Sequence, residues 1–273
     1  FQMSEEMFFL HYGKDGCNRH VLIDECRELF GEIYEQIPEL PFCNIWTAMQ
    51  LSSRLPKGAL FHMGVSNTRR CWNMFQLPES VESACNVGCC GIDGCVSTLV
   101  GASLVNPDRL CYVVVGDLTF FYDLNSLGNH HIGTNLRVML VNNGRGTEFR
   151  LGIHHCNVFG DDADKYMAAA GHFGNKSPLL VKHYAEDLGF HYLSATTKEE
   201  FMTALSNFTN PQLSDHSMIL EVFTDSKDES EALYLMSHIQ SDAKGMVRSK
   251  LKDAVRNVAG EKGINAIKKI LKK

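Results

Sequence analysis

The chain has 273 residues, of which 44% are hydrophobic and 21% are charged, and its formal net charge is −6. This composition predicts a globular protein with enough apolar residues for a core, and it excludes a disordered or collagen-like chain. The apolar runs, such as 110–115, fall far short of the roughly 20 residues that a membrane span needs, and the net acidity gives no reason to expect nucleic acid as a partner.

The first residues and the cysteines indicate the compartment. Residues 1–10 contain an acidic pair and lack the basic start of a secretory signal, so we expect a cytoplasmic protein. The ten cysteines predict free thiols rather than a disulfide scaffold. Because the chain begins at Phe1 instead of a methionine, we expect it to be a piece of a longer protein.

Taken in chain order, the apolar patterns predict helices that alternate with strands. Two helical segments come first, at 21–37 and 44–56. Strands are expected at 58–64, 110–115, 136–141, 190–193 and 217–223. Further helices are expected at 66–76, 95–105, 119–128, 163–172, 178–187 and 197–208. Continuous apolar strands alternating with helices predict a three-layer α/β/α fold with a mostly parallel sheet.

We expect three regions along the chain: a helical linker at 1–43, a central domain at 44–225 and a helical extension at 226–273. The end of the extension is basic, because residues 244–273 contain ten Lys or Arg and two acidic residues, a net charge of +8. Its apolar residues recur at helical spacing and predict two amphipathic helices that pack on the body or on a partner subunit. Binding to an anionic membrane surface is the alternative.

Two polar loops, at 116–119 and 142–146, directly follow consecutive predicted strands. The carboxyl ends of parallel strands form the edge at which open α/β sheets bind ligands. A carboxylate beside a bound phosphate would repel it unless a divalent cation joined the two, and Asp117 and Asn143 offer the oxygen ligands that Mg²⁺ prefers. The pattern predicts a clamp for Mg²⁺ and a diphosphate, although Gly, Asp and Asn also form ordinary turns at strand ends.

The pair Gly116-Asp117 followed by Asn142-Asn143 resembles the signature of thiamine diphosphate (ThDP) enzymes. Stretches at 64–70, 91–98 and 116–127 resemble one subgroup, the 2-succinyl-5-enolpyruvyl-6-hydroxy-3-cyclohexene-1-carboxylate synthases and related 2-oxo acid decarboxylases. The resemblance covers about 44–225 and implies a ThDP-binding fold with bound ThDP and Mg²⁺. It implies a lyase or transferase that decarboxylates a 2-oxo acid and protonates or transfers the resulting carbanion.

The resemblance also implies roles for individual residues. The side chains of Asp117 and Asn143 and the backbone carbonyl of Arg145 would bind Mg²⁺. Arg70 and Glu148 would face the substrate, with Glu148 a candidate for acid–base work. The residues expected to contact ThDP are Ser66, Cys90, Gly91, Ile92, Gly116, Asp117, Leu118, Thr119, Asn143 and Phe149.

Three positions depart from the subgroup. Val87 stands where an arginine binds a substrate carboxylate, Glu148 stands where an apolar residue is usual, and Cys90 replaces a serine. We therefore expect a related enzyme with a different 2-oxo acid or acceptor. The family's pyrimidine-binding domain, which carries the activating glutamate, has no counterpart in 1–57. We expect that domain or subunit as a partner, a homodimer or homotetramer, and little activity from this chain alone.

Two other functions remain open from the sequence. The chain could be the β subunit of a ThDP-dependent 2-oxoacid:ferredoxin oxidoreductase, or a cofactor-binding module that does no chemistry. Two histidine pairs, His130-His131 and His154-His155, and a cysteine cluster lack the spacing of strong metal sites, so we expect ordinary side chains there. The members of that cluster are Cys85, Cys89, Cys90 and Cys95.

Overall fold

The computed structural model describes residues 19–152, 154–172, 176–212 and 214–239. Its strands are β1 (Leu60–Met63), β2 (Glu82–Cys85), β3 (Cys111–Gly116), β4 (Leu136–Asn142), β5 (His191–Ala195) and β6 (Met218–Phe223). Its longer helices are α2 (Arg19–Glu35), α3 (Asn44–Leu51), α5 (Cys95–Val105), α8 (Leu180–Asp187), α9 (Lys198–Phe208) and α10 (Ser226–Ser237). The shorter ones are α4 (Asn67–Trp72), α6 (Asp117–Asp123), α7 (Asp161–Tyr166) and the 3-10 helices η1 (Ser52–Arg54), η2 (Leu124–Gly128), η3 (Thr147–Arg150) and η4 (His155–Phe159).

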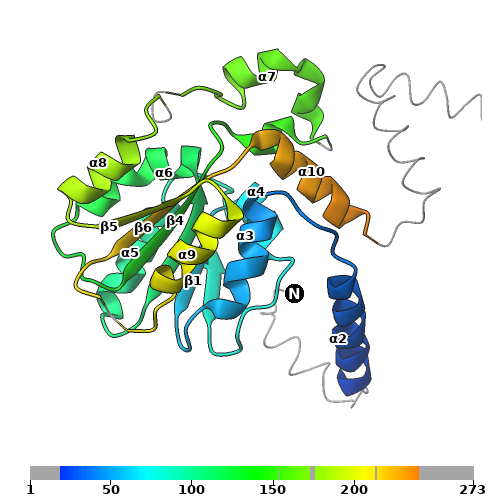
Figure 1. Ribbon diagram of the computed structural model, residues 1–273, viewed down its shortest axis with the longest axis horizontal. Coiled ribbons are helices and arrows are strands. Elements are labelled where there is room, and N and C mark those ends of the chain that lie inside the picture. Colours follow the sequence, from blue (N-terminus) through cyan, green and yellow to red (C-terminus); the bar gives the residue numbers. More distant parts are fainter. Residues whose placement is uncertain (1–18, 153, 173–175, 213, 240–273) are drawn as a thin grey trace, which may run out of the picture.

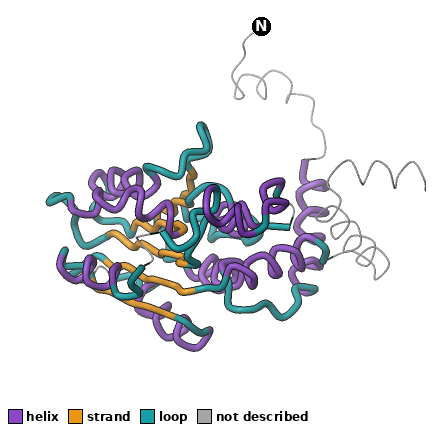
Figure 2. The backbone as a smooth tube through the Cα atoms, turned by 90° about the horizontal axis from the view of Figure 1, so that it is seen from above, coloured by secondary structure: helices purple, strands orange, loops and turns teal. Residues whose placement is uncertain are grey.

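The strands form one sheet in the order β2-β1-β3-β4-β6-β5, and every neighbouring pair is parallel. Helices cover the sheet on both sides, as Figures 1 and 2 show. The predicted three-layer α/β/α fold with a parallel sheet is therefore confirmed. Chain order reverses between β1 and β3, which makes this the switch point at whose carboxyl edge open α/β sheets bind ligands.

Alternation along the central strands builds two cores. Tyr112 and Val114 of β3 pack with α3, α4, α9 and α10 on one face. Cys111, Val113 and Val115 pack with α5, α6 and α8 on the other. Because successive strand residues point to opposite faces, a strand buried on both sides must be apolar throughout, as β3 is.

Several element boundaries differ from the expected ones. The helix expected at 163–172 ends at Tyr166, and the one expected at 119–128 is divided into α6 and η2. The edge strand β2 was not predicted, because its first three residues are exposed and carry no apolar pattern.

The ends of the chain are only partly described. The start of the predicted extension, α10, packs on the body, where Ala232 and Leu233 join the core beside α3. The two amphipathic helices expected in 244–273, and Phe1, lie outside the described residues. Within the described ranges, no helix combines the length and the apolar character that crossing a membrane requires.

Candidate functional site

The sheet brings the four sequence motifs to one edge. Residues 64–70 follow the carboxyl end of β1, and 86–94 follow that of β2. The loops that begin at Gly116 and Asn142 close β3 and β4. Since these four strands are neighbours in the order β2-β1-β3-β4, segments that lie far apart in the sequence share one side of the molecule.

Asp117 and Asn143, the two predicted clamp residues, follow the carboxyl ends of adjacent strands at nearly the same position in the register. β3 and β4 are paired in register up to Gly116 and Val141. Asp117 is the next residue after this pair on one strand, and Asn143 is the second residue after it on the other. Adjacent strands are separated by about 4.8 Å, so both side chains start from the same small region.

Asp117 is a buried carboxylate, with 2% of its surface exposed. Its Oδ1 accepts a hydrogen bond from the N–H of Leu118 at 3.0 Å, and its Oδ2 lies 3.0 Å from Nε2 of His172. His172 comes from a loop 55 residues further along the chain, and the sequence offers no signal for it.

Asn143 has an unused oxygen. Its Oδ1 is buried and has no hydrogen-bond partner among the described residues. A buried amide oxygen without a partner costs about 1–3 kcal/mol, and such atoms are rare unless a water or an ion completes them. An amide oxygen that serves as a ligand to a cation needs no hydrogen-bond donor from the protein.

The preceding residue, Asn142, has a different role. Its Nδ2 donates to Oε1 of Glu221 at 2.7 Å, and the hydroxyl of Tyr192 donates to Oε2 at 2.7 Å. Burial raises the pKa of Glu221, the two hydrogen bonds partly offset this, and the negative charge of Asp117 adds to the rise. Glu221 was missed by sequence reasoning, although an acid inside the apolar strand β6 was a usable signal.

The loop after β4 is held by α7 and by the segment that follows it. Nη1 of Arg145 lies 2.9 Å from both carboxylate oxygens of Asp164. The N–H of Gly146 donates to the carbonyl of Ala168 at 2.6 Å, and the N–H of Gly171 donates to the carbonyl of Gly144 at 3.1 Å. The backbone of the loop is thereby fixed beside Asp117 and Asn143.

Leu118 and Phe149 both pack against Gly146. A Cβ at Gly146 would lie 3.1 Å from Phe149 and 3.2 Å from Leu118, so a side chain here would require these neighbours to shift. The expected cofactor contacts at 118 and 149 are therefore close neighbours in the structure.

The two residues expected to face the substrate form an ion pair with each other. Nη1 of Arg70 lies 2.6 Å from Oε2 of Glu148, and Nη2 lies 3.1 Å from Oε1. The pair connects α4 to η3 across the carboxyl edge of the sheet.

Two of the expected cofactor contacts have unusual backbones. Ser66, between β1 and α4, has φ 61° and ψ −123°, and Cys90 has φ 53°. Side-chain-bearing residues rarely adopt positive φ, and such strain persists only where the surroundings impose it, often at functional sites. Gly91 and Ile92 follow in the loop that leads into α5.

The loop at 86–94 is connected through α5 to α6, the helix that begins with Asp117. Nδ2 of Asn86 donates to the carbonyl of Gly94 at 3.2 Å and to Oγ1 of Thr98 at 3.1 Å, which closes the loop on the start of α5. The N–H of Ser97 donates to Oδ2 of Asp123 at 2.7 Å, which ties α5 to α6.

The described residues contain no group of three or more His, Cys, Asp or Glu side chains that could hold a metal ion. His130 lies in a hollow with Thr134 and Ser217, at the amino ends of β4 and β6, which is the edge opposite to Asp117. Nδ1 of His154 accepts from the N–H of Cys156, and its ring packs edge-on against Phe149 at 5.3 Å. The cysteines of the predicted cluster are free thiols.

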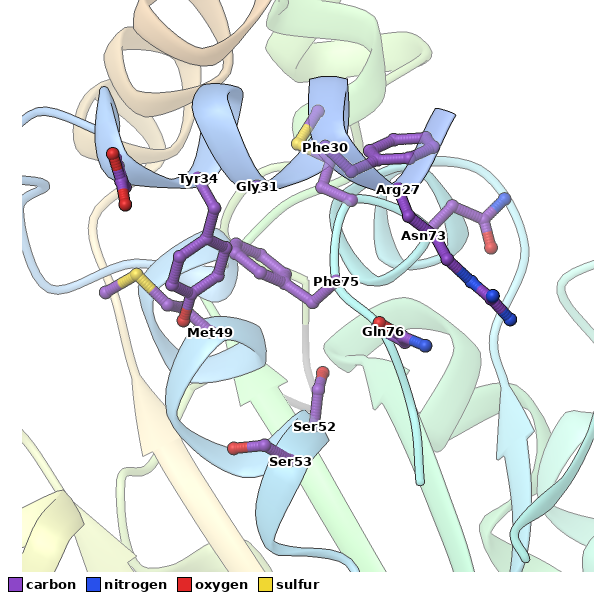
Figure 3. Close-up of a pocket in the computed structure, with 12 residues that line it drawn as sticks. Arg27, Phe30, Gly31, Tyr34, Met49, Ser52, Ser53, Asn73, Phe75 and Gln76 are labelled. Carbon is purple, nitrogen blue, oxygen red and sulfur yellow. The ribbon is translucent and has the colours of Figure 1, made fainter. Parts of the chain in front are cut away.

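A separate cavity of about 700 Å³ lies between α2, α3 and the residues after α4. Figure 3 shows Tyr34 of α2 and Phe75 facing each other across it, and their rings meet edge-on with centroids 6.3 Å apart. Its lining includes none of the residues expected to bind ThDP, Mg²⁺ or substrate.

Comparison with known proteins gives several relatives that share one name. No protein-family model matches the chain. The chain is 34% identical over 196 residues to the 2-succinyl-5-enolpyruvyl-6-hydroxy-3-cyclohexene-1-carboxylate synthase of Bacteroides fragilis, an alignment that covers 72% of the chain and 34% of the relative. Identity to the synthases of the same name is 34% over 200 residues in Phocaeicola vulgatus and 33% over 199 residues in Christiangramia forsetii.

Those two alignments cover 72% and 73% of the chain and 34% and 33% of the relatives. The chain therefore spans about a third of the length of the curated relatives that it matches. The resemblance that the four motifs predict is confirmed, and the matched part of the chain is related to the 2-succinyl-5-enolpyruvyl-6-hydroxy-3-cyclohexene-1-carboxylate synthases.

Proposed function

We propose that this chain is the Mg²⁺- and ThDP-binding part of a ThDP-dependent enzyme that decarboxylates a 2-oxo acid and protonates or transfers the resulting carbanion. The single observation that carries the proposal is the unpartnered, buried Oδ1 of Asn143, directly after β4, next to the strand that ends at the buried carboxylate of Asp117. Two hard oxygen ligands at adjacent strand ends suit Mg²⁺, which commonly binds a few protein groups together with substrate phosphates.

The residues present fit such a group. Asp117 and Asn143 would hold Mg²⁺ through their side chains and Arg145 through its carbonyl, whose loop is already fixed by Asp164 and Ala168. The residues proposed to contact ThDP are Ser66, Cys90, Gly91, Ile92, Gly116, Leu118, Thr119 and Phe149. When bound, ThDP supplies a carbon nucleophile and an electron sink for cleavage of the bond beside a 2-oxo group.

The protein's own part in the reaction is binding and orientation. Glu221 and Tyr192 hold Asn142 and with it the end of β4, so that Asn143 starts from a rigid strand. Phe149 and Leu118 pack at Gly146 and would shield one side of the proposed site from water. Rigid placement of reacting groups contributes directly to rate.

The rest of the active site is proposed to come from a partner. Because the relatives are about three times as long as the part of the chain that matches, we propose that a pyrimidine-binding domain or subunit completes the site. We further propose a homodimer or homotetramer in the cytoplasm as the working form.

Calorimetric titration of the full chain with ThDP in the presence of Mg²⁺ tests the proposal. The wild type is expected to bind, and Asp117→Ala and Asn143→Ala are expected to abolish measurable binding. Asp161→Ala is the matched control, because the side chain of Asp161 is 96% exposed and lies outside the proposed ligand set. A wild-type chain that takes up no ThDP, or variants that bind as it does, would overturn the proposal.

A further inference from the structure

The ion pair between Arg70 and Glu148 uses the whole carboxylate. Both oxygens of Glu148 are engaged by two different nitrogens of one guanidinium, at 2.6 and 3.1 Å. The side chain of Glu148 is 18% exposed and that of Arg70 is 37% exposed, so the pair is partly shielded from water. This two-point geometry is the strongest form of arginine–carboxylate contact.

The pair lies at the edge that carries the proposed cofactor site. Arg70 belongs to α4, which follows β1, the strand next to β3. Glu148 lies between Gly146 and Phe149, in the loop that packs on Leu118. Leu118 is the neighbour of Asp117 in the chain, so a substrate that reaches a cofactor bound there would pass close to this pair.

A guanidinium at such an edge would by itself attract a carboxylate. Its planar fork matches a carboxylate at two points, and its positive charge persists at every physiological pH. In this chain Glu148 already occupies the fork and cancels its charge. A second carboxylate could reach Arg70 only by displacing Glu148, which would then repel it as a negative charge a few ångströms away.

We propose that Glu148 is a specificity-determining residue that fills the carboxylate position at Arg70, so that the site accepts 2-oxo acids with an uncharged side chain and excludes 2-oxo dicarboxylates. The assignment of 2-oxo acids as the ligand class rests on the proposed function. The occupation of Arg70 by an internal carboxylate rests only on the contact itself.

The test compares two ligands of equal chain length, 2-oxoglutarate and 2-oxopentanoate, which differ in the second carboxylate. Their dissociation constants are measured by calorimetry on the full chain, with and without Mg²⁺ and ThDP. Glu148→Ala, which frees the guanidinium and leaves space beside it, is expected to shift the preference toward 2-oxoglutarate at least tenfold relative to the wild type. The double variant Glu148→Ala/Arg70→Gln is expected to lose this gain.

Two further variants keep the result interpretable. Glu148→Gln retains the size of the side chain and removes its charge, so it is expected to shift the preference in the same direction if the alanine variant folds poorly. Glu82→Ala is the matched control: it frees Arg109, whose Nη2 lies 2.8 Å from Glu82, in a pair outside the proposed site, and it is expected to leave the preference unchanged.

The proposal is overturned if neither Glu148 variant gains preference for the dicarboxylate, including the case in which no variant binds either acid. It is also overturned if the wild type prefers 2-oxoglutarate and loses that preference in Arg70→Gln. Titration of the same proteins with Mg²⁺ and ThDP separates the two proposals. A chain that binds the cofactor without a gained preference contradicts only the role of Glu148, and a gained preference without cofactor binding contradicts only the proposed function.

Discussion

Nε2 of His172 lies 3.0 Å from Oδ2 of Asp117, so the carboxylate at the tip of β3 is oriented by a residue from a distant loop. Together with the N–H of Leu118, this contact leaves Asp117 little freedom to rotate. Substitution of a residue that orients a metal ligand in this way commonly lowers metal affinity by about 10–100-fold. His172 is therefore the residue outside the motifs with the most direct connection to the proposed Mg²⁺ site.

We expect His172→Ala to weaken binding of Mg²⁺ and ThDP by about 10–100-fold, because Asp117 would lose the partner that fixes its orientation. Calorimetric titration of the full chain measures the change. His155→Ala, at the exposed first position of η4, serves as the control and should bind like the wild type. Affinity within twofold of the wild type in His172→Ala would show that the contact is dispensable for the cofactor.

The unpartnered oxygen of Asn143 leads to a prediction about stability. Asn143→Ala removes a buried acceptor that makes no hydrogen bond among the described residues, so the ligand-free chain should lose no stability and could gain about 1 kcal/mol. Urea unfolding without cofactor measures this. In the presence of Mg²⁺ and ThDP the order should reverse, because only the wild type gains stability from binding. A large loss of stability without ligand would mean that Asn143 is a structural residue.

The central strands that carry this site were predictable because strands buried on both faces consist almost entirely of apolar residues. The run at 110–115 is apolar throughout, since β3 is covered on both faces, and the strand predicted at 136–141 corresponds to β4. β2 has no such pattern. It is stabilised by pairing with β1, in which Leu60 lies opposite Glu82. The residues of β2 themselves show no pattern that would predict this pairing.

The contacts that complete the site could not be predicted for a related reason. The helix expected at 163–172 ends at Tyr166, and beyond it Ala169 and Gly171 adopt positive φ, 49° and 65°, where the chain turns back toward the strand ends. The N–H of Gly171 then reaches the carbonyl of Gly144, and His172 reaches Asp117. These are long-range contacts, and no periodicity of the segment itself encodes them.

Ser66 provides a test of strain at the site. With φ 61° and ψ −123° it occupies a region that glycine adopts far more easily, so Ser66→Gly is expected to raise the free energy of unfolding by roughly 1 kcal/mol. If its hydroxyl contacts ThDP as proposed, the more stable variant binds the cofactor more weakly. Ser66→Ala keeps the strain and removes the hydroxyl, so it should weaken binding without the gain in stability. Equal stability of the two variants would contradict the interpretation.

Glu229 anchors α10 to α3 from inside the core. Its Oε1 accepts from the N–H of Asn44 at 2.9 Å and from Oγ1 of Thr224 at 2.7 Å, while Oε2 is buried without a partner among the described residues. Burial raises the pKa of Glu229 from 4.5 to about 7, with the hydrogen bonds from Thr224 and Asn44 opposing the rise and the charges of Asp228 and Asp225 adding to it. The folded chain therefore keeps this proton over a pH range in which the unfolded chain has lost it.

A raised carboxyl pKa makes the folded state less stable as pH rises. The contribution of the protonated Glu229 is complete below about pH 4.5, declines between pH 4.5 and 7, and is lost above the folded pKa. Glu229→Gln imitates the protonated form at every pH, so its stability relative to the wild type should increase by roughly 3 kcal/mol between pH 4 and pH 8. Urea unfolding at several pH values measures this difference. Glu231→Gln, at an exposed position of the same helix, should show the same difference from the wild type at every pH. A pH-independent difference for Glu229→Gln would mean that folding does not change the pKa of this carboxyl.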